Sequence, residues 1–356
     1  MSESILNKTA NWFRAVGRVY ELALKREPTE IKLFKDGKVT GTTDGERIMG
    51  RVSIKDDNNG IHTFDVYGQN LTTDRDGNVK EHPQWKMYEA MMDWNPVLNG
   101  DSTEEPTLVN IEGAVEVNDY PNQKGEISTT LRWRVKRANT QVAPDDPTGV
   151  TLKATLLIHS IKEEEKNEEK TGRLVLQLYG ANKKGECFPV KAFVAEDMAD
   201  DFVDCYEKDM TVPFEFEAVS RHIGDEVKAG GKTKFGSHGK VAVNSGFDVT
   251  ELMLVGGDDE IEEPDELTTE DEDGNEIEVK TAWINPEVMK KAIRERNKML
   301  EELLKNGGNK KSSGTTTHNS SLKDKKDANK KTGKFGTTHK VEESDDFDDD
   351  DEEMPF

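Results

Sequence analysis

The stretch "RIMGRVSIKDDNNGIHTFDVYG", residues 47–68, shows the pattern that organises this chain. Apolar and polar residues alternate with a period of two over 47–55 and again over 61–68, as expected for half-buried β-strands. Between these two runs, "DNNG" at 57–60 is a turn signal of the kind that joins strands into a hairpin. We therefore predict an antiparallel pair of strands here.

The flanking sequence extends this pair into a unit of five strands and one helix. The helix is predicted over "PQWKMYEAMMDW", residues 83–94, which has a proline near its start. After a Pro-rich stretch at 143–149 the same order begins again, with its helix at 196–206. Strands are predicted at 12–20, 47–55, 61–68, 107–117 and 127–137, and then at 151–161, 172–180, 186–194, 211–219 and 247–255.

Five strands with a helix between the third and the fourth is the order of the OB-fold, a five-stranded Greek-key barrel. An immunoglobulin-like sandwich would need about seven strands and no interposed helix. We therefore predict a mainly β protein with two tandem OB-folds, residues 1–142 and 150–257. The first is expected to bind nucleic acid.

The rest of the chain is predicted to extend beyond the barrels in four segments. An amphipathic helix is expected over 283–305, with Asn285 as its N-cap and Pro286 at the first helical position. Its apolar stripe favours packing on its own chain over packing on a second copy. The other three segments are an acidic linker with a hairpin around Asp273–Gly274 at 258–282, a disordered Lys-rich linker at 306–340, and an acidic tip at 341–356.

The sequence predicts that this protein is not an enzyme and holds no metal or cofactor. A phosphate-loop-like stretch at 226–233 begins with Glu226 where the motif needs glycine. A calcium-loop-like stretch at 269–280 has Thr269 and Lys280 where carboxylate ligands belong. The two cysteines and seven histidines show no zinc spacing. With no signal peptide or long apolar run, we expect free thiols in a reducing cytoplasm.

The outer faces of three strands in the first barrel are predicted to bind nucleic acid, although the formal net charge of the chain is −23. Alternation places arginines and lysines outward on the first, second and fifth strands with no acid among them, while Trp133 falls on the core side. Cations that follow phosphates, with rings for bases to stack on, suit a single nucleic-acid strand, whereas a solvated charged face is the alternative. The predicted residues are Trp12, Arg14, Arg18, Tyr20, Arg47, Arg51, Lys55, Arg132, Arg134 and Lys136.

The second barrel is predicted to make a weaker contact. Its fourth strand carries Glu215 and Glu217 on the outer face, and the Gly-rich connection at 222–246 is either a mobile basic ligand-binding loop or merely disordered. The predicted residues on the strands are Lys153, Arg173, Tyr179, Lys191 and Phe193, and those in the loop are Lys232, Lys234 and Phe235.

The chain closes with "DDFDDDDEEMPF", residues 345–356. This stretch resembles the acidic C-terminal tip of bacterial and bacteriophage single-stranded DNA-binding proteins, which contain a Phe in an Asp-rich run and end in a hydrophobic residue, Pro and Phe. The resemblance implies that the tip docks on replication, recombination and repair enzymes. Phe347, Met354, Pro355 and Phe356 occupy the matching places.

Taken with the two barrels, the resemblance implies a protein that coats single-stranded DNA with little sequence preference. Bacterial members usually carry one OB-fold per chain, so this chain is more similar to a virus-encoded tandem relative, acting in the cytoplasm of a bacteriophage-infected bacterium. Its oligomeric state is left open. The alternatives are an RNA-binding or RNA-chaperone protein on the same barrels and an acidic nucleic-acid mimic that binds a basic protein. A nuclease is the weakest alternative.

Overall fold

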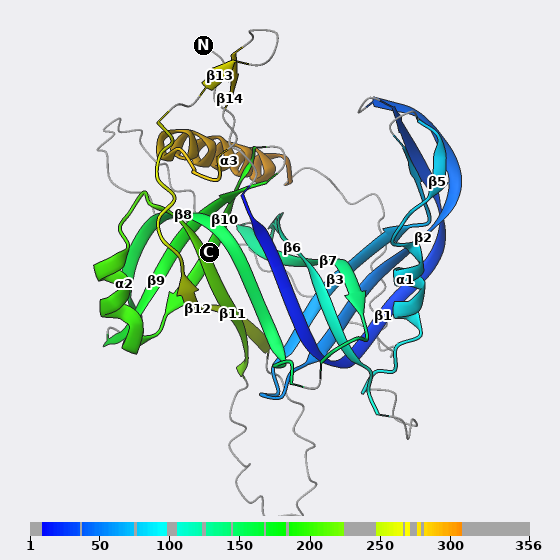
Figure 1. Ribbon diagram of the computed structural model, residues 1–356, viewed down its shortest axis with the longest axis horizontal. Coiled ribbons are helices and arrows are strands. Elements are labelled where there is room, and N and C mark those ends of the chain that lie inside the picture. The colour runs from blue at the N-terminus through cyan, green and yellow to red at the C-terminus, as the bar shows by residue number, and fades with distance from the viewer. Residues whose placement is uncertain are drawn as a thin grey trace, which may run out of the picture.

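The structure is a computed structural model, and the predicted fold class is confirmed in it. The structure describes residues 9–35, 38–74, 77–97, 105–122, 126–143, 145–166, 169–182, 185–223, 247–265, 268–270, 276–278 and 281–307. The predicted Lys-rich linker, apart from Asn306 and Gly307, and the acidic tip lie outside these residues. Figure 1 shows the two barrels side by side, with one helix across the top of the second.

The first barrel closes through five strands in the order β1-β2-β3-β7-β6, with β6 returning to pair with β1. All neighbours are antiparallel except β3 and β7, and α1 (Trp85–Met92) lies between the third and fourth barrel strands in the chain. This is the OB-fold order. The strands are β1 (Asn11–Lys35), β2 (Lys38–Lys55), β3 (Ile61–Gln69), β6 (Leu108–Pro121) and β7 (Ile127–Asn139), and a small hairpin of β4 (Leu71–Thr73) and β5 (Val79–Glu81) precedes α1.

The second barrel repeats this topology. Its order is β8-β9-β10-β12-β11, closed by pairing of β11 with β8, and β10 and β12 are the parallel neighbours. A short 3₁₀ turn, η1 (Glu196–Met198), leads into α2 (Ala199–Cys205) in the position that α1 takes in the first barrel. The strands are β8 (Gly149–Lys166), β9 (Glu169–Ala181), β10 (Cys187–Val194), β11 (Thr211–Ile223) and β12 (Phe247–Gly257).

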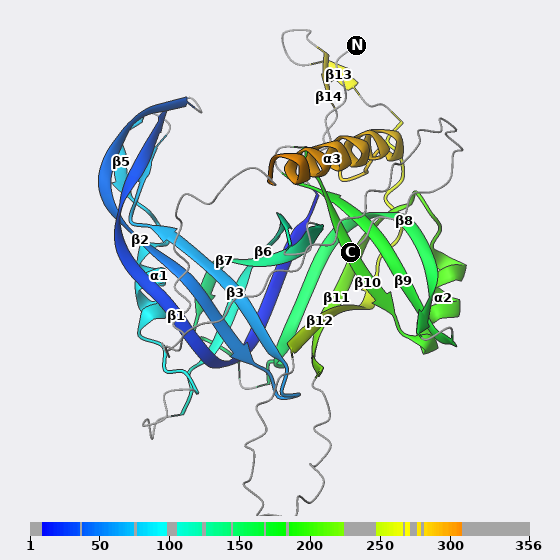
Figure 2. The same ribbon diagram turned by 180° about the vertical axis from the view of Figure 1, so that it is seen from behind.

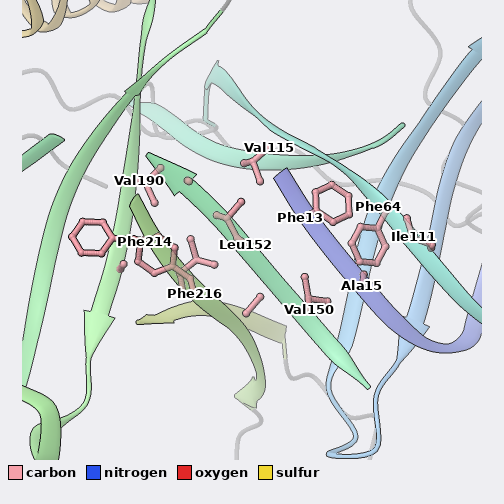
Figure 3. Packing of buried hydrophobic residues seen from close by; sticks show 14 of the residues in the cluster. Phe13, Ala15, Phe64, Ile111, Val115, Val150, Leu152, Val190, Phe214 and Phe216 are labelled. Carbon is pink, nitrogen blue, oxygen red and sulfur yellow. The ribbon is translucent and has the colours of Figure 1, made fainter. Parts of the chain in front are cut away.

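One hydrophobic cluster runs through both barrels because β1 also pairs with β8, where Phe13 lies opposite Leu152. The ring of Phe13 stacks on Phe64 at 5.3 Å and meets Trp133 edge-on at 5.2 Å, which confirms the predicted core position of Trp133. Figure 3 shows side chains of the two barrels meeting around β1 and β8. Burial of this apolar surface is the main force that holds the barrels together.

Helix α3 (Pro286–Gly307) packs on its own chain, as predicted. The Asn285 side-chain oxygen accepts hydrogen bonds from the backbone N–H groups of Glu287 and Val288, so the predicted N-cap is confirmed. Met289 and Ile293 are buried against the second barrel. The expected hairpin before the helix is also present, because β13 (Thr268–Glu270) pairs with β14 (Glu276–Glu278).

The first two strands are far longer than the predicted 12–20 and 47–55. Residues 28–35 and 38–46 leave the barrel as a two-stranded ribbon, which we call the arm, whereas residues 21–27 still pair with the part of β2 that lies in the barrel sheet. Figures 1 and 2 show the arm curving away from the barrel on both views. Most of its side chains are at least partly exposed, and Ile31 is buried, so only a short part of the arm has a buried side from which alternation could be recognised.

The structure also bears on the cysteines and on membrane-spanning helices. Cys187 and Cys205 are free thiols, as predicted, and burial raises the pKa of the Cys187 thiol to about 11. Within the described residues, no helix is long and apolar enough to cross a membrane.

Gly50 in β2 provides a test of how closely the ribbon packs at its base. Its φ is +145°, and a Cβ built there would lie 2.0 Å from the carbonyl oxygen of Ala23 on the paired strand. We expect Gly50→Ala to lower the free energy of unfolding by about 2–4 kcal/mol, because the methyl group forces the strands apart in a strained backbone. Urea denaturation followed by circular dichroism would measure it.

The matched control is Gly41→Ala on the same strand, where a Cβ would meet nothing within 4 Å. This variant is expected to unfold within about 0.5 kcal/mol of the wild type. Equal free energies of unfolding for the two variants would show that the close approach at Gly50 does not exclude a larger side chain from this position.

Candidate nucleic-acid interface

Strands β2, β3 and β7 present one continuous outer face, which we call the barrel-1 face. Cross-strand register brings its side chains together: Arg51 lies opposite Asp65, and Met49 lies opposite Tyr67. On the other side of β3, Asp65 pairs in register with Arg134 of β7. In OB-folds the second and third strands form the surface that binds oligonucleotides.

Four cations gather on the barrel-1 face around two carboxylates. Asp65 lies between Arg51, at 3.3 Å, and Arg132, at 3.6 Å. Glu116 lies 3.6 Å from both Arg134 and Lys136. The barrel-1 face as a whole therefore contains acids. The basic strands carry no outward acid themselves, but neighbouring β3 and β6 supply Asp65 and Glu116.

The cluster keeps an excess of two positive charges after these pairings. Arg51 and Arg132 are exposed, and Arg134 and Lys136 are half-buried. Exposed ion pairs of this kind contribute only about 0–1 kcal/mol, because water solvates both partners in the separated state. The four cations are thus held in position by weak contacts that another anion can replace.

An aromatic ring lies beside these cations. The guanidinium carbon of Arg134 is 5.1 Å from the ring centre of Tyr67, which is half-buried on β3, and the neighbouring Met49 is exposed. Tyr67 was missed among the predicted residues. The signal was available, since alternation over 61–68 places Asp65 and Tyr67 together on the outer side.

Other predicted residues of the first barrel lie in separate groups. Arg47 donates to Glu27 at 2.6 Å, at the base of the arm. Arg18 pairs in register with Lys55 across β1 and β2 and lies 3.5 Å from Glu105. Tyr20 is half-buried at an irregularity in β1.

A third group marks the seam between the barrels. Trp12 of β1 lies opposite Lys153 of β8, and the guanidinium of Arg137 is 5.7 Å from the Trp12 ring centre. Arg14 donates to Asp146 at 2.6 Å, and this hydrogen bond holds the pKa of Asp146 below its usual range. Lys153 pairs with Glu215 of β11 at 3.1 Å.

The corresponding face of the second barrel is closer to neutral. Phe193 of β10 has the guanidinium of Arg173 at 4.6 Å from its ring and the ammonium of Lys191 at 5.5 Å. However, Arg173 is only 14% exposed and pairs with Glu164 at 3.5 Å and Glu251 at 3.2 Å. The Arg173–Phe193 pair therefore resembles the Arg134–Tyr67 pair of the barrel-1 face, but the charge of Arg173 is more fully compensated by carboxylates.

The prediction that Tyr179 contacts nucleic acid is wrong, because its side chain is only 1% exposed. It points away from the barrel interior, as alternation predicted, but Met289 and Ile293 of α3 cover this side of β9. Burial raises the pKa of its hydroxyl. No nucleic acid can reach it in this arrangement, and alternation within β9 could not show that a helix more than 100 residues later covers this side.

The remaining predicted residues lie outside the described residues. These are Lys232, Lys234 and Phe235 of the long loop, and Phe347, Met354, Pro355 and Phe356 of the tip. Across the described ranges, no group of three or more His, Cys, Asp or Glu side chains is arranged to hold a metal ion.

Comparisons were made with solved structures, with curated proteins and with models of protein families. Among solved structures, the wild-type single-stranded DNA binding protein from Thermus aquaticus is similar at 11% identity with a TM-score of 0.37, over 73% of this chain and 97% of that chain. A deletion mutant of the same protein is similar at 12% identity with a TM-score of 0.34, over 73% and 99% of the two chains. These scores are too low to add to the fold assignment, which rests on strand order.

A search of curated proteins gave no match. The family model described as YorF matches residues 11–306, a range that spans both barrels and nearly all of α3. The chain therefore belongs to the YorF family.

Proposed function

We propose that this protein binds single-stranded DNA on the barrel-1 face. The observation that carries the proposal is the cluster of Arg51, Arg132, Arg134 and Lys136 beside Tyr67, on the outer face of an OB-fold barrel. Cations spaced along a strand pair follow a phosphate backbone, and a neighbouring ring accepts a base.

The chemistry of binding is an exchange of anions. A phosphate approaching Arg51 and Arg132 replaces Asp65 as their partner, and one near Arg134 and Lys136 replaces Glu116. Stacking of a base on Tyr67 adds about 1–3 kcal/mol. Neither contact reads the edges of bases, so little sequence preference is expected.

The same strand extends across the seam in this proposal. Trp12, Arg14 and Lys153 supply a ring and two cations between the barrels, and Phe193 supplies the stacking position on the second barrel. The second barrel binds more weakly, because Arg173 already has two carboxylate partners. Lys232, Lys234 and Phe235 of the long loop would close over the strand there.

The cellular part of the proposal comes from the tail. Coating of single-stranded DNA during replication, recombination and repair, with partner enzymes recruited through Phe347, Met354, Pro355 and Phe356, fits the acidic tip with its apolar end. A virus-encoded protein acting in the cytoplasm of an infected bacterium is part of the same proposal.

Neutralising two cations tests the barrel-1 face. We expect Arg51→Gln with Arg132→Gln to weaken binding of an oligo-dT of about 30 nucleotides by about 10–100-fold, because two phosphate contacts are lost. The slope of log K against log salt should fall by roughly 1.4. Fluorescence anisotropy of the labelled oligomer at several salt concentrations measures both quantities.

Two further variants sharpen this experiment. Asp65→Asn should tighten binding, because it removes the carboxylate that competes with phosphate for Arg51 and Arg132. Arg294→Gln with Lys298→Gln, two exposed cations on α3, is the matched control and should bind as the wild type does. Unchanged affinity in the Arg51/Arg132 variant would contradict the proposal. A ribo-oligomer of the same sequence and a duplex competitor, run alongside, test the RNA alternative and strand selectivity.

Removing the tip tests its proposed role. A chain ending at Val341 loses ten acidic residues and the apolar end. It should bind oligo-dT as tightly as the full chain at high salt and more tightly at low salt, since the acids no longer compete for the basic face. Anisotropy titrations of both chains measure this. Weaker binding after truncation would show that the tip belongs to the DNA site.

A further inference from the structure

The end of the arm is exposed, apolar and basic at the same time. Phe34 and Val39 lie opposite each other across the ribbon and are 44% and 55% exposed. Lys32 lies two residues before Phe34 on the same strand, and Lys35 and Lys38 form the next pair along the ribbon, on its opposite face; all three are exposed. Residues 31–43 hold these three lysines against the single acid Asp36. Large apolar side chains exposed among cations mark a surface that meets a partner with both negative charge and an apolar face.

The base of the arm contacts neighbouring elements on several sides. Arg26 donates to Glu89 of α1 at 2.8 Å and to Glu46 on the paired strand, and its guanidinium lies 5.3 Å from the ring centre of Trp85. The hydrogen bond from Arg26 holds the pKa of the Glu46 carboxyl below its usual range.

The small hairpin β4–β5 supports the outer half of the arm. The backbone N–H of Phe34 donates to the Thr73 hydroxyl at 3.3 Å. Closer to the barrel, Glu46 and Asn70 exchange two hydrogen bonds of 2.9 Å. A ribbon held by such contacts loses less conformational entropy when it binds. Less of the binding free energy from contacts at its end is then offset by the cost of ordering.

Strand β2 connects the arm to the candidate interface. Strand β2 carries Arg51 on the barrel-1 face and then runs outward through Glu46 to Lys38. These last nine residues extend roughly 30 Å at about 3.3 Å per residue. A strand of DNA leaving the barrel-1 face beside β2 therefore emerges along the arm.

We propose that the arm docks on duplex DNA where it meets the single strand held by the barrel. A two-stranded β-ribbon fits a groove of the duplex, where Lys32, Lys35 and Lys38 reach phosphates on either side. The terminal base pair of such a junction is an exposed apolar surface, on which Phe34 and Val39 pack. This inference rests on the proposed function only for the position of the single strand.

The test compares two labelled probes by anisotropy. One is the oligo-dT alone, and the other is the same oligo-dT attached to a hairpin duplex of about 12 base pairs. The wild-type chain is expected to bind the tailed duplex about tenfold more tightly. Phe34→Ala with Val39→Ala should remove most of this gain while binding oligo-dT within about twofold of the wild type.

Three lysine substitutions and one control complete the set. Lys32→Gln with Lys35→Gln and Lys38→Gln should also remove the gain, and should reduce the salt dependence on the tailed duplex alone. Val203→Ala with Val255→Ala replaces two exposed valines of the second barrel and should leave the gain unchanged. Thermal unfolding of every variant confirms that the fold is intact.

The outcomes separate this inference from the proposed function. A gain on the tailed duplex that survives both arm variants overturns the inference. An equal loss on oligo-dT and the tailed duplex also overturns it, because the arm then belongs to the single-strand site. Self-association in sedimentation that the arm variants abolish, with the gain unchanged, would instead assign the arm to contact between copies. Failure of every form to bind oligo-dT would overturn the proposed function itself.

Discussion

Residues Phe13–Val16 of β1 hydrogen-bond to β6 along one edge and to β8 along the other. The same strand then turns its second edge to β2 and continues into the arm. One strand therefore closes the first barrel, joins the second barrel to it and forms half of the extension. Because every backbone group of a buried strand needs a partner, these pairings fix the barrels in one orientation. Figure 1 shows β1 running from beside the second barrel, through the first barrel and into the arm.

Helix α3 adds a second connection between the barrels. Met289 and Ile293 bury its apolar side against the second barrel. Arg296, which is buried, donates to Asp119 at 2.6 Å and to Thr129 at 3.2 Å on the β6–β7 hairpin of the first barrel. A buried arginine with a carboxylate and a hydroxyl partner is costly to separate, because separation leaves a buried charge unpaired. The helix that buries Tyr179 therefore also holds the two barrels together.

Net charge is a poor guide to the surface of this protein. The chain carries 72 acidic residues against 49 lysines and arginines, yet the barrel-1 face has four cations around two acids. Acids on neighbouring strands hold these cations in place without cancelling them, and exposed pairs of this kind exchange partners at little cost. The second barrel differs because Arg173 is largely buried between Glu164 and Glu251.

The sequence by itself determined the succession of strands along the chain, the helix between the third and fourth strands of each barrel, and the Asn285 cap. Each of these depends on local periodicity or on a local hydrogen bond. Only the tertiary structure decided that Asp65 and Glu116 meet the predicted cations, that α3 covers Tyr179, and that residues 28–35 and 38–46 form an arm. Alternation along a strand shows which side is buried in its own barrel. It does not show the register with neighbouring strands, or what covers the other side, because those depend on residues distant in the chain.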